Sequence, residues 1–294
     1  MPPSIRRPLR LGLAAATAAL TAACSPLTLF STFTPKDPAS RLNAGTAYGP
    51  LSRQKLDVYA PRRTKAGAPV AVFFYGGSWD SGRRQDYRWV GQALAAQGYV
   101  TVVPDYRIYP EVTYPHFLED GAAAIRWAVD HAAAYGGDPS RIVLIGHSAG
   151  AYNAVMLGLD GRYLKAQGVD IHRIRAVAGL SGPYDFVPLD GPITRRTFGG
   201  AADLAATQPA TYVSAASPPA FLATGDADRT VFPRNTKALA RTLRGAGVRV
   251  EERHYAGIDH AGMVLALSRP LRGRAPVLAE MSAFLDAAVK PGAD

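Results

Sequence analysis

The feature that most constrains the fold is a serine between an apolar run and a helix-like segment. Residues 142–145 are apolar and typical of a buried strand, whereas residues 149–159 have the pattern of a helix. Between them stands Gly146-His147-Ser148-Ala149-Gly150, a G-x-S-x-G sequence. A strand, a sharp turn and a helix in this order would strain the serine backbone and raise its hydroxyl above the sheet. Glycine is expected at the two flanking positions because side chains there would collide with the neighbouring strand and helix.

Strands alternate with helices along most of the 294 residues, which predicts an α/β fold with a mostly parallel sheet covered on both faces. A chain of this length can form one such domain. Residues 186–216 show little strand pattern, and we expect a small helical lid there. Strands are predicted at 54–59, 70–75, 100–103, 142–145, 174–180, 220–224 and 248–255, and helices at 87–97, 116–135, 149–159, 234–244 and 275–289.

Polar or glycine-rich clusters follow several predicted strands. They are Tyr75-Gly76-Gly77-Ser78-Trp79, the serine turn, Gly225-Asp226-Ala227-Asp228, and Asp259-His260. In a parallel sheet, ligands bind beyond the carboxyl ends of the strands. We therefore expect these loops to converge at one edge of the sheet.

A serine hydroxyl is a weak nucleophile and needs a base within hydrogen-bond reach. His260 is the candidate base, because an imidazole exchanges protons near neutral pH. His147 adjoins Ser148 in sequence, and we expect its side chain to point away from that of the serine. The other histidines are interpreted as structural or surface residues: His116, His131, His172 and His254.

A carboxylate should hold the imidazole in the right tautomer. Asp228 is the preferred candidate. Asp226 is its rival, but it lies nearer the strand end, where aspartate side chains often cap a turn. Asp259 adjoins His260 and is interpreted as a loop residue.

The oxyanion hole is predicted from backbone amides near the serine. Its candidates are the amide of Ala149 and those of Gly77 and Gly76, with Ser78 as a further option. Glycine lets the backbone approach a tetrahedral intermediate closely. Trp79 is interpreted either as a wall of the acyl site or as plain packing, and the sequence favours neither.

The N-terminal region has the layout of a signal peptide over residues 1–23, with a basic start and an alanine-rich apolar run. The run ends at Cys24 in a sequence that resembles the bacterial lipobox, so we expect lipidation of this single cysteine. The alternative is an ordinary secretory signal. We predict a flexible tether at 24–43 and a catalytic domain at 44–294, placed in the cell envelope or secreted. One cysteine excludes an intrachain disulfide.

The net charge of +10 raises nucleic acid as a partner, but the basic residues are scattered and indicate a solvated surface instead. Attraction to anionic lipid headgroups is a further option. The sequence has no His-Glu-x-x-His, no Cys/His cluster, no P-loop and no dinucleotide-binding spacing. We expect no metal, no cofactor and no nucleic acid, and the oligomeric state is left open.

From about Lys55 to Leu285 the chain resembles an α/β-hydrolase of the carboxylesterase branch, which includes hormone-sensitive-lipase-like esterases, prenylcysteine methylesterases and kynurenine formamidases. The motifs that carry the resemblance are the clusters above together with Val103-Pro104-Asp105-Tyr106-Arg107 and Gly137-Asp138-Pro139-Ser140-Arg141. Tyr75 stands where these esterases commonly have the histidine of His-Gly-Gly. Asp105-Tyr106-Arg107 is expected to buttress the glycine loop.

The resemblance implies a serine hydrolase with a Ser148-Asp228-His260 triad that cleaves carboxylic esters, of short acyl chains by our interpretation. The same machinery could serve a formamidase or a peptidase. A non-catalytic binding protein on this fold is a further alternative, although all three triad residues are present.

Overall fold

The computed structural model describes residues 26–63 and 66–290. Its centre is an eight-stranded sheet in the order β1-β2-β4-β3-β5-β6-β7-β8. The pairs β1–β2 and β2–β4 are antiparallel and all others are parallel, so the predicted mostly parallel sheet is confirmed. The strands are β1 (Ala39–Ala47), β2 (Lys55–Pro61), β3 (Ala68–Phe74), β4 (Val100–Pro104), β5 (Gly137–His147), β6 (Ile174–Leu180), β7 (Ala220–Gly225) and β8 (Val250–Tyr255).

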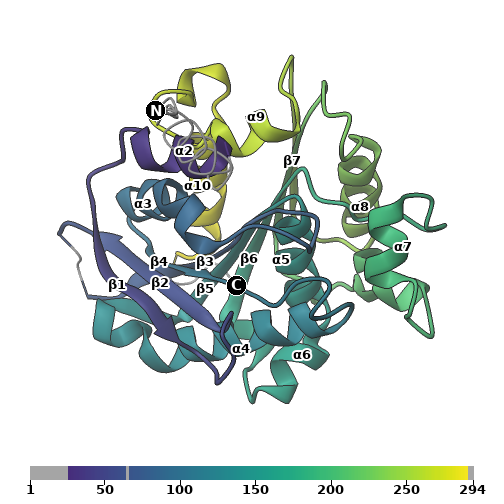
Figure 1. Ribbon diagram of the computed structural model, residues 1–294, viewed down its shortest axis with the longest axis horizontal. Coiled ribbons are helices and arrows are strands. Elements are labelled where there is room, and N and C mark those ends of the chain that lie inside the picture. The colour runs from purple at the N-terminus through teal and green to yellow at the C-terminus, as the bar shows by residue number, and fades with distance from the viewer. Residues whose placement is uncertain (1–25, 64–65, 291–294) are drawn as a thin grey trace, which may run out of the picture.

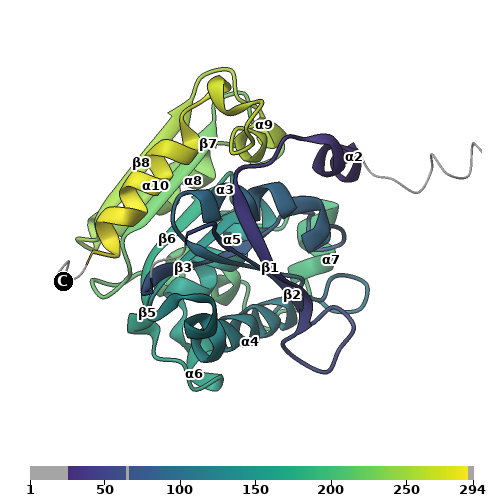
Figure 2. The ribbon, with the colours of Figure 1, turned by 90° about the vertical axis from the view of Figure 1, so that its left-hand side faces the viewer.

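Helices cover both faces of the sheet, with α3 and α10 on one face and α4, α5 and α8 on the other (Figures 1 and 2). No helix within residues 26–290, the gap at 64–65 aside, is long and apolar enough to cross a bilayer. The α-helices are α2 (Pro26–Phe33), α3 (Arg88–Ala96), α4 (His116–His131), α5 (Ala149–Leu159), α6 (Gly161–Ala166), α7 (Pro192–Phe198), α8 (Arg234–Gly245), α9 (His260–Leu265) and α10 (Val277–Ala288). The 3-10 helices are η1 (Arg84–Tyr87), η2 (Ala132–Tyr135), η3 (Ile171–Arg173), η4 (Ala205–Thr207), η5 (Pro209–Tyr212) and η6 (Arg272–Arg274).

The central strands form where the sequence is continuously apolar. Residues 70–74 of β3 and 142–145 of β5 are fully buried, as expected of strands covered on both faces. Strand β5 begins five residues before the predicted apolar run, because Gly137 and Asp138 pair with Ala68 and Pro69 of β3. Hydrophobicity cannot reveal such a polar extension, since backbone hydrogen bonds alone define it.

The prediction of a flexible tether at 24–43 is wrong for the residues that the structure describes. Residues 26–33 form α2, and β1 begins at Ala39 and pairs with β2. The ring of Phe30 meets Trp89 edge-on at 5.4 Å, and Thr28 Oγ1 donates a hydrogen bond to Asp86 at 2.8 Å. The folded domain therefore includes α2, ahead of the predicted boundary at residue 44. Residues 1–23 and Cys24 lie outside the described residues.

The last residue of β5 ties the sheet to α9. His147 is buried, and its Nε2 lies 2.9 Å from the carbonyl oxygen of His260, to which it donates a hydrogen bond. Its Nδ1 has no partner among the described residues. Burial, followed by the charge of the nearby His260, lowers the pKa of His147 from its ordinary value near 6.5 to about 3. The folded state therefore favours the neutral imidazole.

We predict that this histidine makes the fold sensitive to acid. Between about pH 6.5 and pH 3 the unfolded chain binds a proton at His147 that the folded chain does not, so stability falls as the pH falls. Above this window both states are neutral there and the contribution is constant. One such group changes the free energy of unfolding by at most about 1.4 kcal/mol per pH unit.

Urea unfolding at a series of pH values should show a shallower acid-side fall for His147→Gln than for the wild type. His116→Gln is the matched control, because that side chain is 50% exposed on the surface of α4, and it should retain the wild-type pH dependence. Equal slopes for the wild type and His147→Gln would contradict the prediction.

Candidate active site

Ser148 occupies the turn between β5 and α5, where its backbone has φ 56° and ψ −126°. A left-handed φ is costly for a residue with a side chain, so the surrounding packing must impose it. A Cβ on Gly146 would lie 2.1 Å from the carbonyl oxygen of Gly150, and one on Gly150 would lie 2.1 Å from that of Phe74. Both glycines are therefore required, as the sequence pattern predicts.

A chain of two hydrogen bonds links Ser148 to a buried carboxylate. The Oγ of Ser148 lies 2.8 Å from Nε2 of His260, and Nδ1 of that histidine lies 2.8 Å from Oδ2 of Asp228. The serine immediately precedes α5, the histidine begins α9, and the aspartate follows β7. These elements come from distant parts of the chain and meet at one edge of the sheet (Figure 1).

The turn after β7 shows which of the two candidate acids, Asp228 or Asp226, is hydrogen-bonded to His260. The side chain of Asp228 is fully buried, and its Oδ1 accepts hydrogen bonds from the amides of Thr230 and Val231, both at 2.9 Å. Burial alone would raise the pKa of this carboxyl, but the hydrogen bonds from His260 and the Val231 amide outweigh burial and hold the pKa below its ordinary value. The carboxylate is thus charged near neutral pH.

The two other candidate acids have local roles. Asp226 accepts a hydrogen bond from the amide of Gly257 at 2.7 Å and so braces the loop before α9. Asp259 is the N-cap of α9, where it accepts from the amide of Gly262 at 2.7 Å. Neither makes a hydrogen bond to the imidazole of His260 in the described part of the chain.

The glycine loop after β3 lies directly against the serine. A Cβ on Gly76 would lie 2.9 Å from the Cβ of Ser148. Gly77 adopts φ 132°, and its carbonyl oxygen accepts hydrogen bonds from the amides of Asp80 and Ser81, both at 3.0 Å. A Cβ on Gly77 would lie 2.4 Å from the carbonyl oxygen of Ser81. The loop thus brings its backbone to the serine, opposite the first turn of α5 where Ala149 lies.

Tyr75 does not point toward the serine. Its ring is buried between the rings of Tyr87 and Tyr106, with centroid distances of 5.2 and 4.9 Å. Its hydroxyl donates to Asp105 at 2.8 Å, and Asp105 also pairs with Arg84. Tyr75, which stands at the position of the histidine of His-Gly-Gly, therefore supports the glycine loop and does not reach the serine. Asp105 supports the loop with it, as the sequence predicts.

The packing role predicted for Trp79 is confirmed, and its role as a wall of the acyl site stays a prediction. Its indole nitrogen donates to Asn153 at 3.0 Å, and its ring packs edge-on against Tyr152 and Phe198. It also lines a cavity of about 240 Å³ that reaches Ser148. The stretch 186–216, where a small helical lid is predicted, contains α7, η4 and η5 separated by non-helical residues, and residues 190–194 around the start of α7 form part of the cavity wall.

A second cavity of about 520 Å³ reaches Ser148 from another direction. Its lining includes the glycine loop and His260, and beyond them side chains of α2 and α9. Both ribbon views place α2 beside α9 (Figures 1 and 2). His147 also lines this cavity, and its ring lies 4.9 Å from that of His260. Sequence reasoning missed α2 and α9, because both are short and neither shows a clear amphipathic period.

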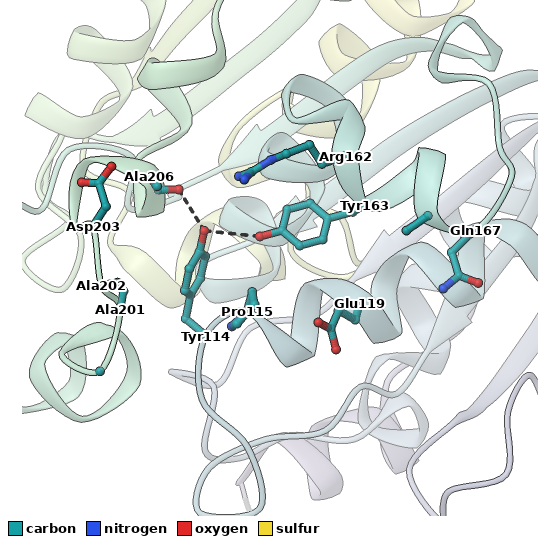
Figure 3. Close-up of a pocket in the computed structure, with 12 residues that line it drawn as sticks. Tyr114, Pro115, Glu119, Arg162, Tyr163, Gln167, Ala201, Ala202, Asp203 and Ala206 are labelled. Carbon is teal, nitrogen blue, oxygen red and sulfur yellow. Dashed lines mark hydrogen bonds between the residues drawn. The ribbon is translucent and has the colours of Figure 1, made fainter.

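A further hollow of about 540 Å³ lies apart from this site, between α4, α6 and residues 200–206 (Figure 3). Its lining includes Tyr114, whose hydroxyl donates to the carbonyl of Ala206 at 2.9 Å, and Tyr163, whose hydroxyl donates to Tyr114 at 3.3 Å. None of the three hydrogen-bonded residues Ser148, His260 and Asp228 lines it. We do not include it in the candidate site.

Known proteins that are similar to this chain include several esterases. The isoprenylcysteine alpha-carbonyl methylesterase of Arabidopsis thaliana is 29% identical to this chain over 80% of this chain and 60% of that protein. Carboxylesterase NlhH of Mycobacterium tuberculosis is 40% identical over 38% of this chain and 36% of that protein. The crystal structure of esterase B from Lactobacillus rhamnosis has the same fold, with a TM-score of 0.78 at 21% identity, covering 94% of this chain and 93% of that one.

The chain spans 52–61% of the length of the plant relatives that it matches. The BD-FAE family matches residues 56–243, a stretch that includes Ser148 and Asp228 and ends before His260. Because of this match, the chain belongs to the BD-FAE family, within the α/β-hydrolase superfamily.

Proposed function

We propose that this protein hydrolyses carboxylic esters through an acyl-enzyme formed on Ser148. The observation that carries the proposal is the pair of 2.8 Å hydrogen bonds from Ser148 through His260 to Asp228. Relatives named as a methylesterase and a carboxylesterase support it. No metal or cofactor takes part in the proposed reaction.

The residues divide the work of acyl transfer. His260 Nε2 takes the proton of the Ser148 hydroxyl while the serine oxygen bonds to the ester carbonyl carbon. Asp228 orients the imidazole and stabilises its positive charge. His260 then gives the proton to the departing alcohol oxygen. In the second half of the reaction His260 takes a proton from water while the water oxygen bonds to the acyl carbon, and it returns that proton to the Ser148 oxygen as the bond to the acyl group breaks and the acid is released. The proposed oxyanion donors are the amides of Ala149 and Gly77, assisted by Gly76.

The proposed acyl preference is for short chains. Support comes from the cavity of about 240 Å³ beside Ser148, which Trp79 and Phe186 confine. This volume lies below the roughly 300–1,000 Å³ of typical sites for drug-sized ligands. A long acyl chain would have to leave the cavity and would gain little from burial.

Replacing the nucleophile gives the direct test. Ser148→Ala should lower hydrolysis of p-nitrophenyl acetate by about 10⁴-fold or more and abolish labelling by a fluorophosphonate probe. The melting temperature should change little, because only one side-chain hydrogen bond is lost. Ser140→Ala, a serine at the far end of β5, is the matched control and should react normally. Labelling of Ser148→Ala would refute the assignment. Aryl-formamide and peptide substrates are tested alongside the ester, to distinguish an esterase from a formamidase or a peptidase.

The choice of acid predicts unequal effects for two aspartates of one turn. Asp228→Asn should lower kcat by up to about 10⁴-fold, because the amide favours the wrong imidazole tautomer. Asp226→Asn should cost much less, since its carboxylate bonds to a backbone amide of the neighbouring loop. Steady-state kinetics of both variants check this, and the reverse ranking would transfer the role to Asp226.

The acyl cavity predicts a dependence on chain length. Among p-nitrophenyl esters, those with acyl chains of about C2 to C6 should be hydrolysed fastest, because each methylene gains about 0.8 kcal/mol only while it can be buried. The measurement is kcat/KM across the series. A maximum at C12 or longer would show that the acyl chain is not confined to this cavity.

We further propose that the protein is exported and lipidated at Cys24. The support is the sequence alone, a signal-like leader that ends in the single cysteine. An acylated N-terminus with more than one lipid chain would anchor the protein stably to a membrane. Metabolic labelling with a palmitate analogue should mark the wild type and not Cys24→Ser. An unlabelled wild-type protein free in the periplasm or medium would reduce the leader to a secretory signal.

A further inference from the structure

Two cavities with different linings meet at Ser148. Both contain Ser78, Ser148 and Thr230. The smaller one continues along α7 and the start of α8, whereas the larger one continues between α2 and α9. His260 lines only the larger cavity. An ester bound at the serine has two halves, so the arrangement offers a separate place for each.

The larger cavity is apolar. Its far wall consists of Leu27 and Phe30 from α2 and Val264 and Leu265 from α9, with Tyr87 beside them. Tyr87 and the two imidazoles are the titratable groups in its lining, which contains no carboxylate, lysine or arginine among the described residues. Its volume of about 520 Å³ falls within the range of cavities that bury small organic ligands.

The chemistry of the leaving group decides which half of the ester enters this cavity. The departing alcohol oxygen must take a proton from Nε2 of His260, so it lies within hydrogen-bond reach of that atom. The group attached to this oxygen is thereby directed toward the cavity that the histidine lines. The acyl group stays on Ser148 and occupies the smaller cavity.

We propose that the cavity between α2 and α9 binds a bulky apolar alcohol group of the substrate, and that Leu27 and Phe30 set this preference. The inference rests on the proposed function, since it takes His260 as the acid that protonates the leaving group. The substrate class that follows is an ester of a short acid with a large apolar alcohol. Helix α2 lies outside the stretch that the BD-FAE family matches, so this wall belongs to the chain's own N-terminal segment.

Helix α2 is fixed in place as a wall. Thr28 bonds to Asp86, and the hydroxyl of Ser31 donates to the carbonyl of Gln85 at 3.1 Å. After the helix, Asp37 pairs with Arg272 at 2.8 Å. Leu27 packs against the core from one side of the helix, whereas Leu29 is 49% exposed on another side. The helix therefore offers the same residue type inside and outside the cavity.

The test compares Leu27→Ala with the matched control Leu29→Ala in the full-length chain. Acetates of ethanol, hexanol and 1-naphthol vary the alcohol, while ethyl acetate and ethyl hexanoate vary the acid. Leu27→Ala should lower the ratio of kcat/KM for hexyl acetate over ethyl acetate about tenfold, because buried methylene contacts are lost. Leu29→Ala should leave that ratio at the wild-type value. The ratio of ethyl hexanoate over ethyl acetate should be unaffected in both.

A second variant, which fills the cavity with a larger side chain, keeps the test informative if Leu27→Ala does not fold. Leu27→Trp should reduce hydrolysis of 1-naphthyl acetate at least tenfold relative to ethyl acetate, since the indole would occupy the cavity. Equal alcohol ratios for the Leu27 and Leu29 variants would overturn the proposal. A changed ethyl hexanoate ratio in Leu27→Ala would overturn it too, by placing the acyl group in this cavity. If the proposed function is wrong, no ester hydrolysis that depends on Ser148 occurs in the wild type. Finding such hydrolysis therefore separates the outcomes above from a failure of the proposed function.

Discussion

The site depends on a close approach of backbones at the serine turn. Gly150 of α5 lies so near the end of β3 that a Cβ there would stand 2.1 Å from the carbonyl oxygen of Phe74. This contact fixes the start of α5 against the sheet and imposes the left-handed φ of Ser148. It also places the loop after β3, with Gly76 and Gly77, against the serine. Ser148 and the proposed oxyanion donors are thus positioned by one steric constraint rather than by several weak contacts.

The histidine and the carboxylate are held by a different kind of interaction. Asp228 is buried, and two backbone amides of its own turn solvate one of its oxygens. The second oxygen remains for His260, whose carbonyl receives the hydrogen bond from His147. In the proposed reaction His260 gains a proton, and the neutral state of the buried His147 beside it avoids the repulsion that two imidazolium ions would produce. The low pKa of His147 is therefore compatible with proton transfer at its neighbour.

Sequence reasoning could predict the elements whose signal is local. The apolar runs of β3 and β5, and the span of α5 from Ala149 to Leu159, agree with the structure. The glycine turn identified Ser148 for the same reason. Residues 26–47 escaped prediction, because α2 is short and is held by residues 54 and 58 positions away, through the backbone carbonyl of Gln85 and the side chain of Asp86. This segment is rich in serine and threonine, as a linker is. It folds because of its contacts with residues that are distant in the sequence.

The same distinction applies to substrate choice. Residues that perform the chemistry must meet tight geometric demands, so they leave recognisable motifs in the sequence. Walls of a binding cavity need only be apolar and correctly placed, and many side chains satisfy that requirement. Leu27, Phe30 and Leu265 belong to short helices at either end of the domain, and no motif relates them. The fold alone brings them to one cavity. The proposed preference for the alcohol group therefore depends on tertiary packing of two segments that lie on either side of the stretch that the family matches.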